Sequence, residues 1–149
     1  MKSFLEPLLK KKIVILGFAF KANTNDTRES PAIQIVKDLI ENGAEIIISD
    51  PKVKILQIER DLEREENYKG RSSEYGYWNF SEDIYEAVQD ADAIVLLTEW
   101  EEYKNLDWQK IEKSMRSPSW VFDARSIVQI DQIKKTDLNL WSIGNGSLG

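Results

Sequence analysis

The chain has 149 residues, 42% of them hydrophobic and 31% charged, which is typical of one soluble globular domain with its own core. It contains no cysteine and no histidine, and this excludes disulfides, thiolate metal sites, cysteine nucleophiles and histidine bases within the chain. The formal net charge of -6 argues against nucleic-acid binding, because nucleic-acid proteins carry a basic excess on their binding face.

No apolar run approaches the length that spans a membrane, and the opening residues MKSFLEPLLKKK lack the features of a signal peptide. We therefore expect a cytoplasmic protein that does not bind membranes. Residues 1–11, with several large apolar side chains, are typical of the end of a connecting helix that arrives from a preceding part. We expect the folded domain to occupy residues 12–149.

Short apolar runs predict the strands of a sheet. They are β-branched and nearly continuous, which suits parallel strands that are covered on both faces. In chain order they are Ile13–Leu16, Glu45–Ser49, Ala93–Leu97 and Trp120–Phe122, with Leu138–Ile143 as a weaker fifth candidate.

Helical patterns separate these strands. The first begins at Pro31, a residue suited to a first helical turn, and ends at Gly43. A short helix is expected after Ser81 as its N-cap, and another after Asp107. This alternation predicts the α/β class, as a doubly wound, Rossmann-like, mostly parallel sheet of about five strands with helices on both faces.

The stretch Glu59–Asn79 interrupts the alternation. It is charged at first, then contains glycine and serine, and is too long for a tight connection. We interpret it as the end of a helix followed by an exposed insertion.

A long polar loop, GFAFKANTNDTRESP at Gly17–Pro31, follows the first predicted strand. Ligands of open α/β sheets bind at the carboxyl ends of the strands, where this loop lies. A dinucleotide fingerprint is incomplete, because only Gly17 fits it while Ala19 and Ala22 occupy the other glycine positions. What remains is a loop that offers backbone N–H groups and two cations to phosphate oxygens.

Two other strand ends carry residues that need an interpretation. Asp50 stands where a ribose-binding acid would lie, but Pro51 follows it, so a turn-forming aspartate is the simpler interpretation. Trp100 is interpreted as a packing residue that closes the crevice. The acidic run TEWEEY around it is interpreted as a solvated helix start, since no histidine joins it to make a metal site.

Cations from two strand ends favour an anion site. Alone, Lys21 would be a solvated loop lysine, and Arg28 would order the loop by pairing with Asp26 or Glu29. Arg125, however, follows VFDA at another strand end. Two cations from separate strand ends can grip one anion.

These motifs resemble a known family. GFAFKANTNDTRESPAI, the pair DP at 50–51, LLTEW and FDAR occur in the order and spacing of the UDP-glucose/GDP-mannose dehydrogenases, in their carboxyl-terminal nucleotide-sugar-binding domain. The resemblance covers nearly the whole chain. Within the family it is most similar to the UDP-glucose 6-dehydrogenase branch of the animal and plant type.

The resemblance implies a larger enzyme, expected to be a homo-oligomer, in which a preceding domain binds NAD and supplies a catalytic cysteine. Such enzymes oxidise the C6 alcohol of UDP-glucose twice, to the carboxylate. This chain carries no cysteine, so we expect it to hold no catalytic residue and to be inactive alone.

Site residues follow from the resemblance, position by position. It implies that Phe20 contacts the nucleotide sugar through its backbone and that Lys21 binds its phosphate or sugar region. It also implies that Arg28 reaches the NAD of the other domain and that Arg125 contacts the UDP-sugar. Ala124 stands where the family has glycine, which bears on the aim of Arg125. A dehydrogenase of GDP-mannose or of a UDP-N-acetylhexosamine, and a free-standing nucleotide-sugar-binding module, are the alternatives.

Overall fold

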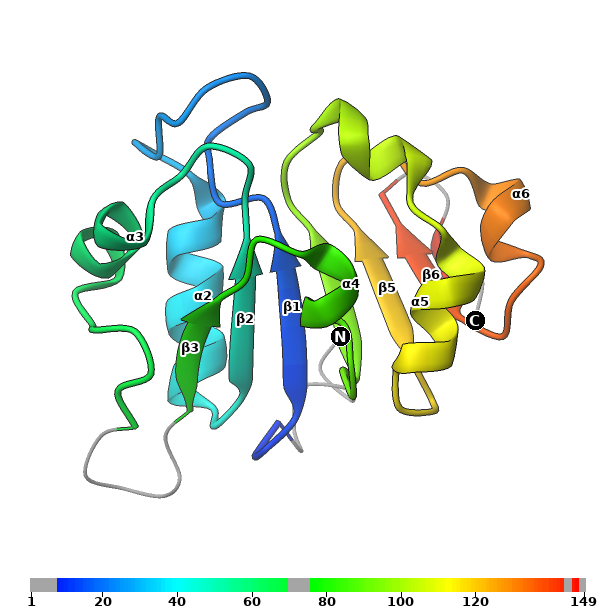
Figure 1. The fold of residues 1–149 in the computed structure, drawn as a ribbon, viewed down its shortest axis with the longest axis horizontal. Helices are drawn as coiled ribbons and strands as arrows, with labels where there is room; N and C mark the ends of the chain where they lie inside the picture. The colour runs from blue at the N-terminus through cyan, green and yellow to red at the C-terminus, as the bar shows by residue number, and fades with distance from the viewer. Residues whose placement is uncertain (1–7, 70–75, 144–145, 148–149) are drawn as a thin grey trace.

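The computed structural model describes residues 8–69, 76–143 and 146–147, and their main feature is one sheet (Figure 1). The strand order is β3-β2-β1-β4-β5-β6-β7. Strands β1 to β6 are parallel, and the short β7 is antiparallel to β6. The bounds are β1 Lys12–Leu16, β2 Glu45–Ser49, β3 Tyr77–Phe80, β4 Ala93–Leu96, β5 Trp120–Asp123, β6 Asn139–Ser142 and β7 Gly146–Ser147.

Helices connect the successive parallel strands from β1 to β6. The Ser30 hydroxyl accepts a hydrogen bond from the Ala32 N–H at the start of the first helix, Pro31 takes its first position, and Asp107 caps a later helix through the Lys110 N–H. The bounds are α2 Pro31–Glu41, α3 Ile55–Leu62, α4 Ile84–Ala87, α5 Trp108–Ser114 and α6 Ile130–Ile133, with a 3-10 helix, η1, at Glu101–Asn105.

Alternate residues of β1 enter two separate cores. Ile13 and Ile15 pack in one cluster with the buried residues of α2 and α3, whereas Val14 and Leu16 pack with those of α4, α5 and α6. Figure 1 shows α2 behind the sheet and α4 and α5 in front of it. The predicted α/β class with helices on both faces is confirmed, and both faces of β1 are buried, as its continuous apolar run indicates.

The sheet agrees with the predicted parallel sheet of about five strands, with β3 and the short β7 added to the strands that the apolar runs indicate. The stretch Glu59–Asn79 begins with the end of a helix, as expected, because α3 runs to Leu62, but the expected exposed insertion is wrong at its end. Residues Tyr77–Phe80 form β3, which pairs in parallel with β2 at an edge of the sheet. Trp78 is fully buried, and its indole N–H donates to the Arg64 carbonyl. Part of this stretch, residues 70–75, lies outside the described residues.

The expected cap of the helix before β4 also needs correction. Ser81 does not cap the helix before β4, because Asp83 accepts the N–H groups of Tyr85 and Glu86, while the Ser81 hydroxyl donates to the Asp83 carbonyl. Of the helix end expected over residues 1–11, the first seven residues lie outside the described part. Residues 8–11 form a turn closed by the Lys11 N–H and the Leu8 carbonyl.

No helix among the described residues is both long and apolar enough to cross a bilayer.

Candidate functional site

The loop after β1 begins at a glycine that the fold requires. Gly17 has φ +97°, and a Cβ there would lie 2.3 Å from the Thr98 Oγ1. The Gly17 N–H donates to the Ser49 carbonyl at 2.8 Å, and the Thr98 hydroxyl donates to the Ala19 carbonyl at 3.0 Å. The carboxyl ends of β1, β2 and β4 are therefore in direct contact.

Asp50 fixes this loop with a buried carboxylate. Its Oδ2 accepts the N–H groups of Phe18 and Ala19 at 2.8 and 3.0 Å, and its Oδ1 accepts those of Lys52 and Val53 at 2.8 and 3.0 Å. An ionised carboxylate has about four acceptor positions, so none is left for ribose hydroxyls. The turn-forming interpretation of Asp50 is confirmed.

The rest of the loop is held on α3. Gln57 donates to the Asn25 carbonyl at 2.7 Å, and the Thr27 hydroxyl donates to the Asp61 carboxylate at 2.5 Å. The Phe20 N–H closes the loop on the Asp26 carbonyl at 2.8 Å. The Phe20 side chain, 45% exposed, and Lys21, also exposed, are thereby presented to solvent on a fixed backbone.

Arg125 stands on a second anchored turn. The buried Asp123 accepts the Arg125 N–H at 3.0 Å through Oδ1 and the Val128 N–H at 2.7 Å through Oδ2. The guanidinium of Arg125 lies against Glu99, with Nη2 2.5 Å from Oε2. Glu99 also accepts the Ala22 N–H through Oε1 at 3.4 Å. The structure thus brings the loop after β1, the end of β4 and the end of β5 together.

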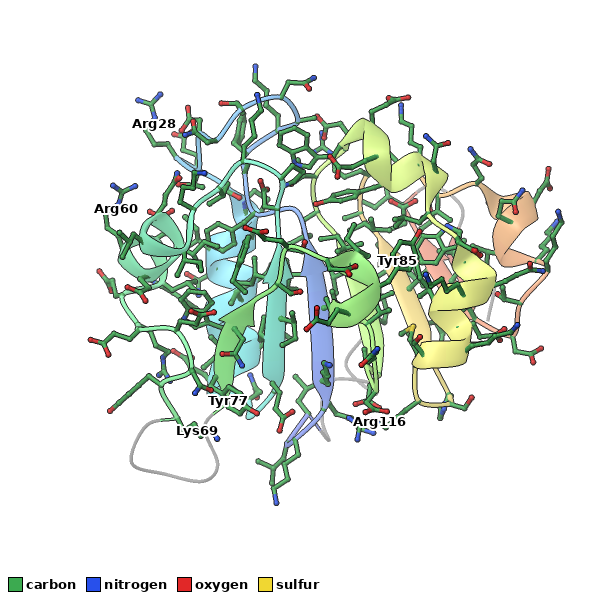
Figure 2. All side chains as sticks on the ribbon, viewed as in Figure 1. Arg28, Arg60, Lys69, Tyr77, Tyr85 and Arg116 are labelled. Carbon is green, nitrogen blue, oxygen red and sulfur yellow. The ribbon has the colours of Figure 1, made fainter. Side chains whose placement is uncertain are left out.

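Arg28 lies apart from this contact and points into solvent, on the same side as Arg60 of α3 (Figure 2). Its side chain is 88% exposed. Nη2 and Nε donate to the two Asp26 carboxylate oxygens at 2.9 and 3.1 Å. These hydrogen bonds lower the pKa of Asp26 to about 2. Of the two partners expected for Arg28, Asp26 and Glu29, the structure shows Asp26.

Glu99 is a residue of the candidate site that the sequence alone did not indicate. The solvated helix start expected for TEWEEY is the 3-10 helix η1, but Glu99 precedes it and turns toward Arg125. Trp100 is 5% exposed, which confirms its packing role. One signal was available, because Glu99 and Arg125 both follow strands at the same sheet edge with opposite charges.

Comparison with known proteins decides the family. The model of the UDP-glucose/GDP-mannose dehydrogenase family, UDP binding domain, matches residues 14–130. The chain belongs to this family.

Curated relatives of this dehydrogenase family are longer proteins. The chain is 39% identical to UDP-glucose 6-dehydrogenase 4 of Arabidopsis thaliana, with 97% of the chain and 32% of that protein aligned. It is 41% identical to UDP-glucose 6-dehydrogenase 1 of Glycine max, over 95% of the chain and 31% of that protein. The chain spans about a third of the length of these relatives.

Solved structures of similar fold include dehydrogenases from Pyrococcus horikoshii and Methanosarcina mazei Go1. A UDP-D-ManNAc dehydrogenase from Pyrococcus horikoshii matches 97% of the chain and 28% of its own length, with a TM-score of 0.68 and 28% identity. An NDP-N-acetyl-D-galactosaminuronic acid dehydrogenase from Methanosarcina mazei Go1 matches 97% of the chain and 27% of its own length, with a TM-score of 0.73. Its 23% identity supports the fold alone.

Ala124, which stands where the resemblance implies a glycine, fits the turn before Arg125. The Ala124 N–H donates to the Leu96 carbonyl at 3.1 Å. The left-handed residue of this turn is Ser126, with φ 57°, so the extra methyl group of Ala124 does not force a strained backbone.

A pocket of about 510 Å³ opens elsewhere on this edge of the family domain, beyond the ends of β2 and β3. Residues 49–56 line it together with Phe80 and Tyr103. Phe20, Lys21 and Arg125 are not among its lining residues. The residues that the sequence predicts for the nucleotide sugar therefore lie outside the wall of this pocket.

The Asp26–Arg28 contact predicts a titration. We expect the Asp26 carboxyl to titrate at about 2, and Arg28→Ala to return its pKa toward the ordinary value of 3.8, because both guanidinium hydrogen bonds are lost. Since the folded-state pKa is the lower one, the contact stabilises the fold above pH 3.8 and loses its effect as the pH falls toward 2. Carboxyl ¹³C NMR measures the shift, with Arg60→Ala as the control. An Asp26 pKa that Arg28→Ala leaves unchanged would contradict the contact.

Proposed function

We propose that this domain binds the UDP part of a nucleotide sugar at the carboxyl edge of its sheet, through Phe20, Lys21 and Arg125. We further propose that it does so within an NAD-dependent UDP-glucose 6-dehydrogenase that converts UDP-glucose to UDP-glucuronate in two oxidation steps. The observation that carries the proposal is the contact of Glu99 with both Ala22 and Arg125, because it joins the Lys21 loop to the Arg125 turn.

The three side chains suit a nucleoside diphosphate. Arg125 offers a planar fork of N–H donors and Lys21 a compact charge, and both groups bind phosphate oxygens well. The half-exposed Phe20 ring offers apolar surface that a sugar or base can cover. Asp50 and Asp123 accept hydrogen bonds from backbone N–H groups of neighbouring segments. Their carboxylates therefore stabilise the loops and do not face the ligand.

The chemical step requires groups that this chain does not carry. It has no cysteine to form a covalent intermediate with the sugar, so we propose that the chain alone has no dehydrogenase activity. NAD would bind mainly to another domain, with Arg28 reaching it across an interface. The 88% exposure of the Arg28 side chain supports this role. We propose that the complete enzyme is a cytoplasmic homo-oligomer in which residues 12–149 form the UDP-binding domain.

A related substrate is the main alternative. Cations that grip a diphosphate do not distinguish the base or the sugar, and one similar structure carries the name of a UDP-D-ManNAc dehydrogenase. The 39% and 41% identities to two plant UDP-glucose 6-dehydrogenases favour UDP-glucose. A GDP-mannose dehydrogenase and a free-standing binding module have no comparable support.

We expect the purified chain to bind UDP, with NMR shifts centred on Gly17–Ala22 and Arg125. Lys21→Ala and Arg125→Ala should each weaken binding about ten- to hundredfold, because each removes a charge-assisted contact of about 1.5–3 kcal/mol. Lys135→Ala, which removes an exposed cation after α6, is the control. Shifts confined to residues 49–56 would place UDP in the neighbouring pocket and refute the proposed site.

The NAD role of Arg28 is tested in the complete enzyme. Arg28→Ala should raise the KM for NAD about tenfold or more and leave that for UDP-glucose nearly unchanged, since only the cofactor loses a charged contact. Asp26→Ala is the matched control, because it breaks the same ion pair but keeps the guanidinium. If Asp26→Ala reproduces the defect, Arg28 acts by ordering the loop, and the NAD assignment is wrong.

A further inference from the structure

Glu99 makes the contact between the loop that carries Lys21 and the turn that carries Arg125. One carboxylate oxygen lies 2.5 Å from Arg125 Nη2, and the other accepts the Ala22 N–H at 3.4 Å. Ala22 directly follows Lys21, so a single side chain touches both the turn that carries Arg125 and the loop that carries Lys21. The Arg125 side chain is 40% exposed and so stays open to a ligand, whereas the Glu99 oxygen that faces it is buried.

The backbone of Glu99 is fixed on both sides. Thr98 before it is fully buried, and its hydroxyl donates to the Ala19 carbonyl at 3.0 Å. Trp100 after it is 5% exposed and packs in the core beneath α5. Because both neighbours are buried, the Glu99 carboxylate extends from a rigid base. It is therefore suited to hold another group in place rather than to swing aside.

Arg125 keeps donors for a second partner. A guanidinium carries five N–H donors in one plane, and the contact with Glu99 uses Nη2. The remaining donors stay available to a phosphate, while the Arg125 backbone is already held by Asp123. Asp123 thus holds the Arg125 backbone, and Glu99 contacts the Arg125 side chain. Together these two carboxylates determine the direction in which the free N–H donors of Arg125 point.

We propose that Glu99 is a positioning residue for the nucleotide diphosphate, acting through Arg125, and this inference rests on the proposed function. It orders the guanidinium before the ligand arrives, so less side-chain freedom is lost on binding. It also keeps the Arg125 turn beside the Lys21 loop, so that both cations face one anion.

Charge alone gives the opposite expectation. Glu99 is an acid next to a site for an anion, so its neutralisation would strengthen UDP binding if Glu99 did nothing but repel the ligand. Positioning predicts that neutralisation weakens binding. The direction of the change therefore separates the two roles.

The test is UDP titration of the 149-residue chain and of Glu99→Gln, by calorimetry. We expect Glu99→Gln to weaken UDP binding about five- to tenfold, because the ion pair that orders the Arg125 side chain before binding is lost. In an Arg125→Ala background the same change should cause no further loss. Glu101→Gln is the matched control, because it removes the same charge two residues away from a glutamate that pairs with Lys104 at 3.1 Å.

A second measurement follows Arg125 without ligand. NMR of the arginine Nη–H groups should give resolved Arg125 signals in the parent chain, and these should average in Glu99→Gln as the guanidinium rotates freely. Thermal unfolding of Glu99→Gln identifies any loss of the fold. Should the folded variant leave the Arg125 signals unchanged, the positioning claim is overturned.

The outcomes separate the two proposals. If the parent chain binds UDP and Glu99→Gln binds it equally well or better, Glu99 is not a positioning residue, while the proposed function stands. An equal loss in the Arg125→Ala background also overturns the inference, because Glu99 would then act independently of Arg125. If the parent chain does not bind UDP at millimolar concentration, the proposed function fails, and the positioning role fails with it.

Discussion

The buried carboxylate of Asp50 is the interaction on which the carboxyl edge of this sheet depends. Two of its four backbone N–H partners belong to the loop after β1 and two to the turn after β2. A buried N–H group without an acceptor costs about 1–3 kcal/mol, so this one side chain determines the path of both segments. Asp123 likewise fixes the turn that carries Arg125, because its carboxylate accepts two backbone N–H groups of that turn.

This arrangement explains how a dinucleotide-type topology can serve another ligand. In the usual form of this fold, a glycine-rich turn binds the pyrophosphate and an acid at the end of the second strand binds the ribose. Here the acid at that position, Asp50, has no acceptor left, and the loop after β1 is long and fixed on α3. The cations that the loops present, rather than a glycine-rich turn, are then the groups available to an anion.

The sequence predicts the parts of this fold that depend on local patterns. Apolar runs located β1, β2, β4 and β5, and Asp107 was identified as a cap because the N-cap preference is local. Strand β3 was missed because YWNF is short and follows a charged stretch with glycine and serine, and its support comes from pairing with β2, which no local pattern contains. Asp83 was overlooked as a cap because Ser81 is an equally good capping type two residues earlier.

In the candidate site, too, contacts between residues near in sequence could be predicted, whereas contacts between distant residues could not. The Arg28 contact with Asp26 spans two residues and could be read from the chain. The Glu99 contacts join residues 77 and 26 positions away, so they depend on which strands are neighbours in the sheet. The strand order places β4 between β1 and β5, and this order alone brings the three segments together.

The most direct test of this account is a crystal structure of the chain with UDP. The account predicts diphosphate oxygens within about 3.2 Å of both Lys21 Nζ and an Arg125 guanidinium nitrogen, with the four Asp50 hydrogen bonds intact. A diphosphate bound along residues 49–56, or one that neither cation contacts, would contradict it.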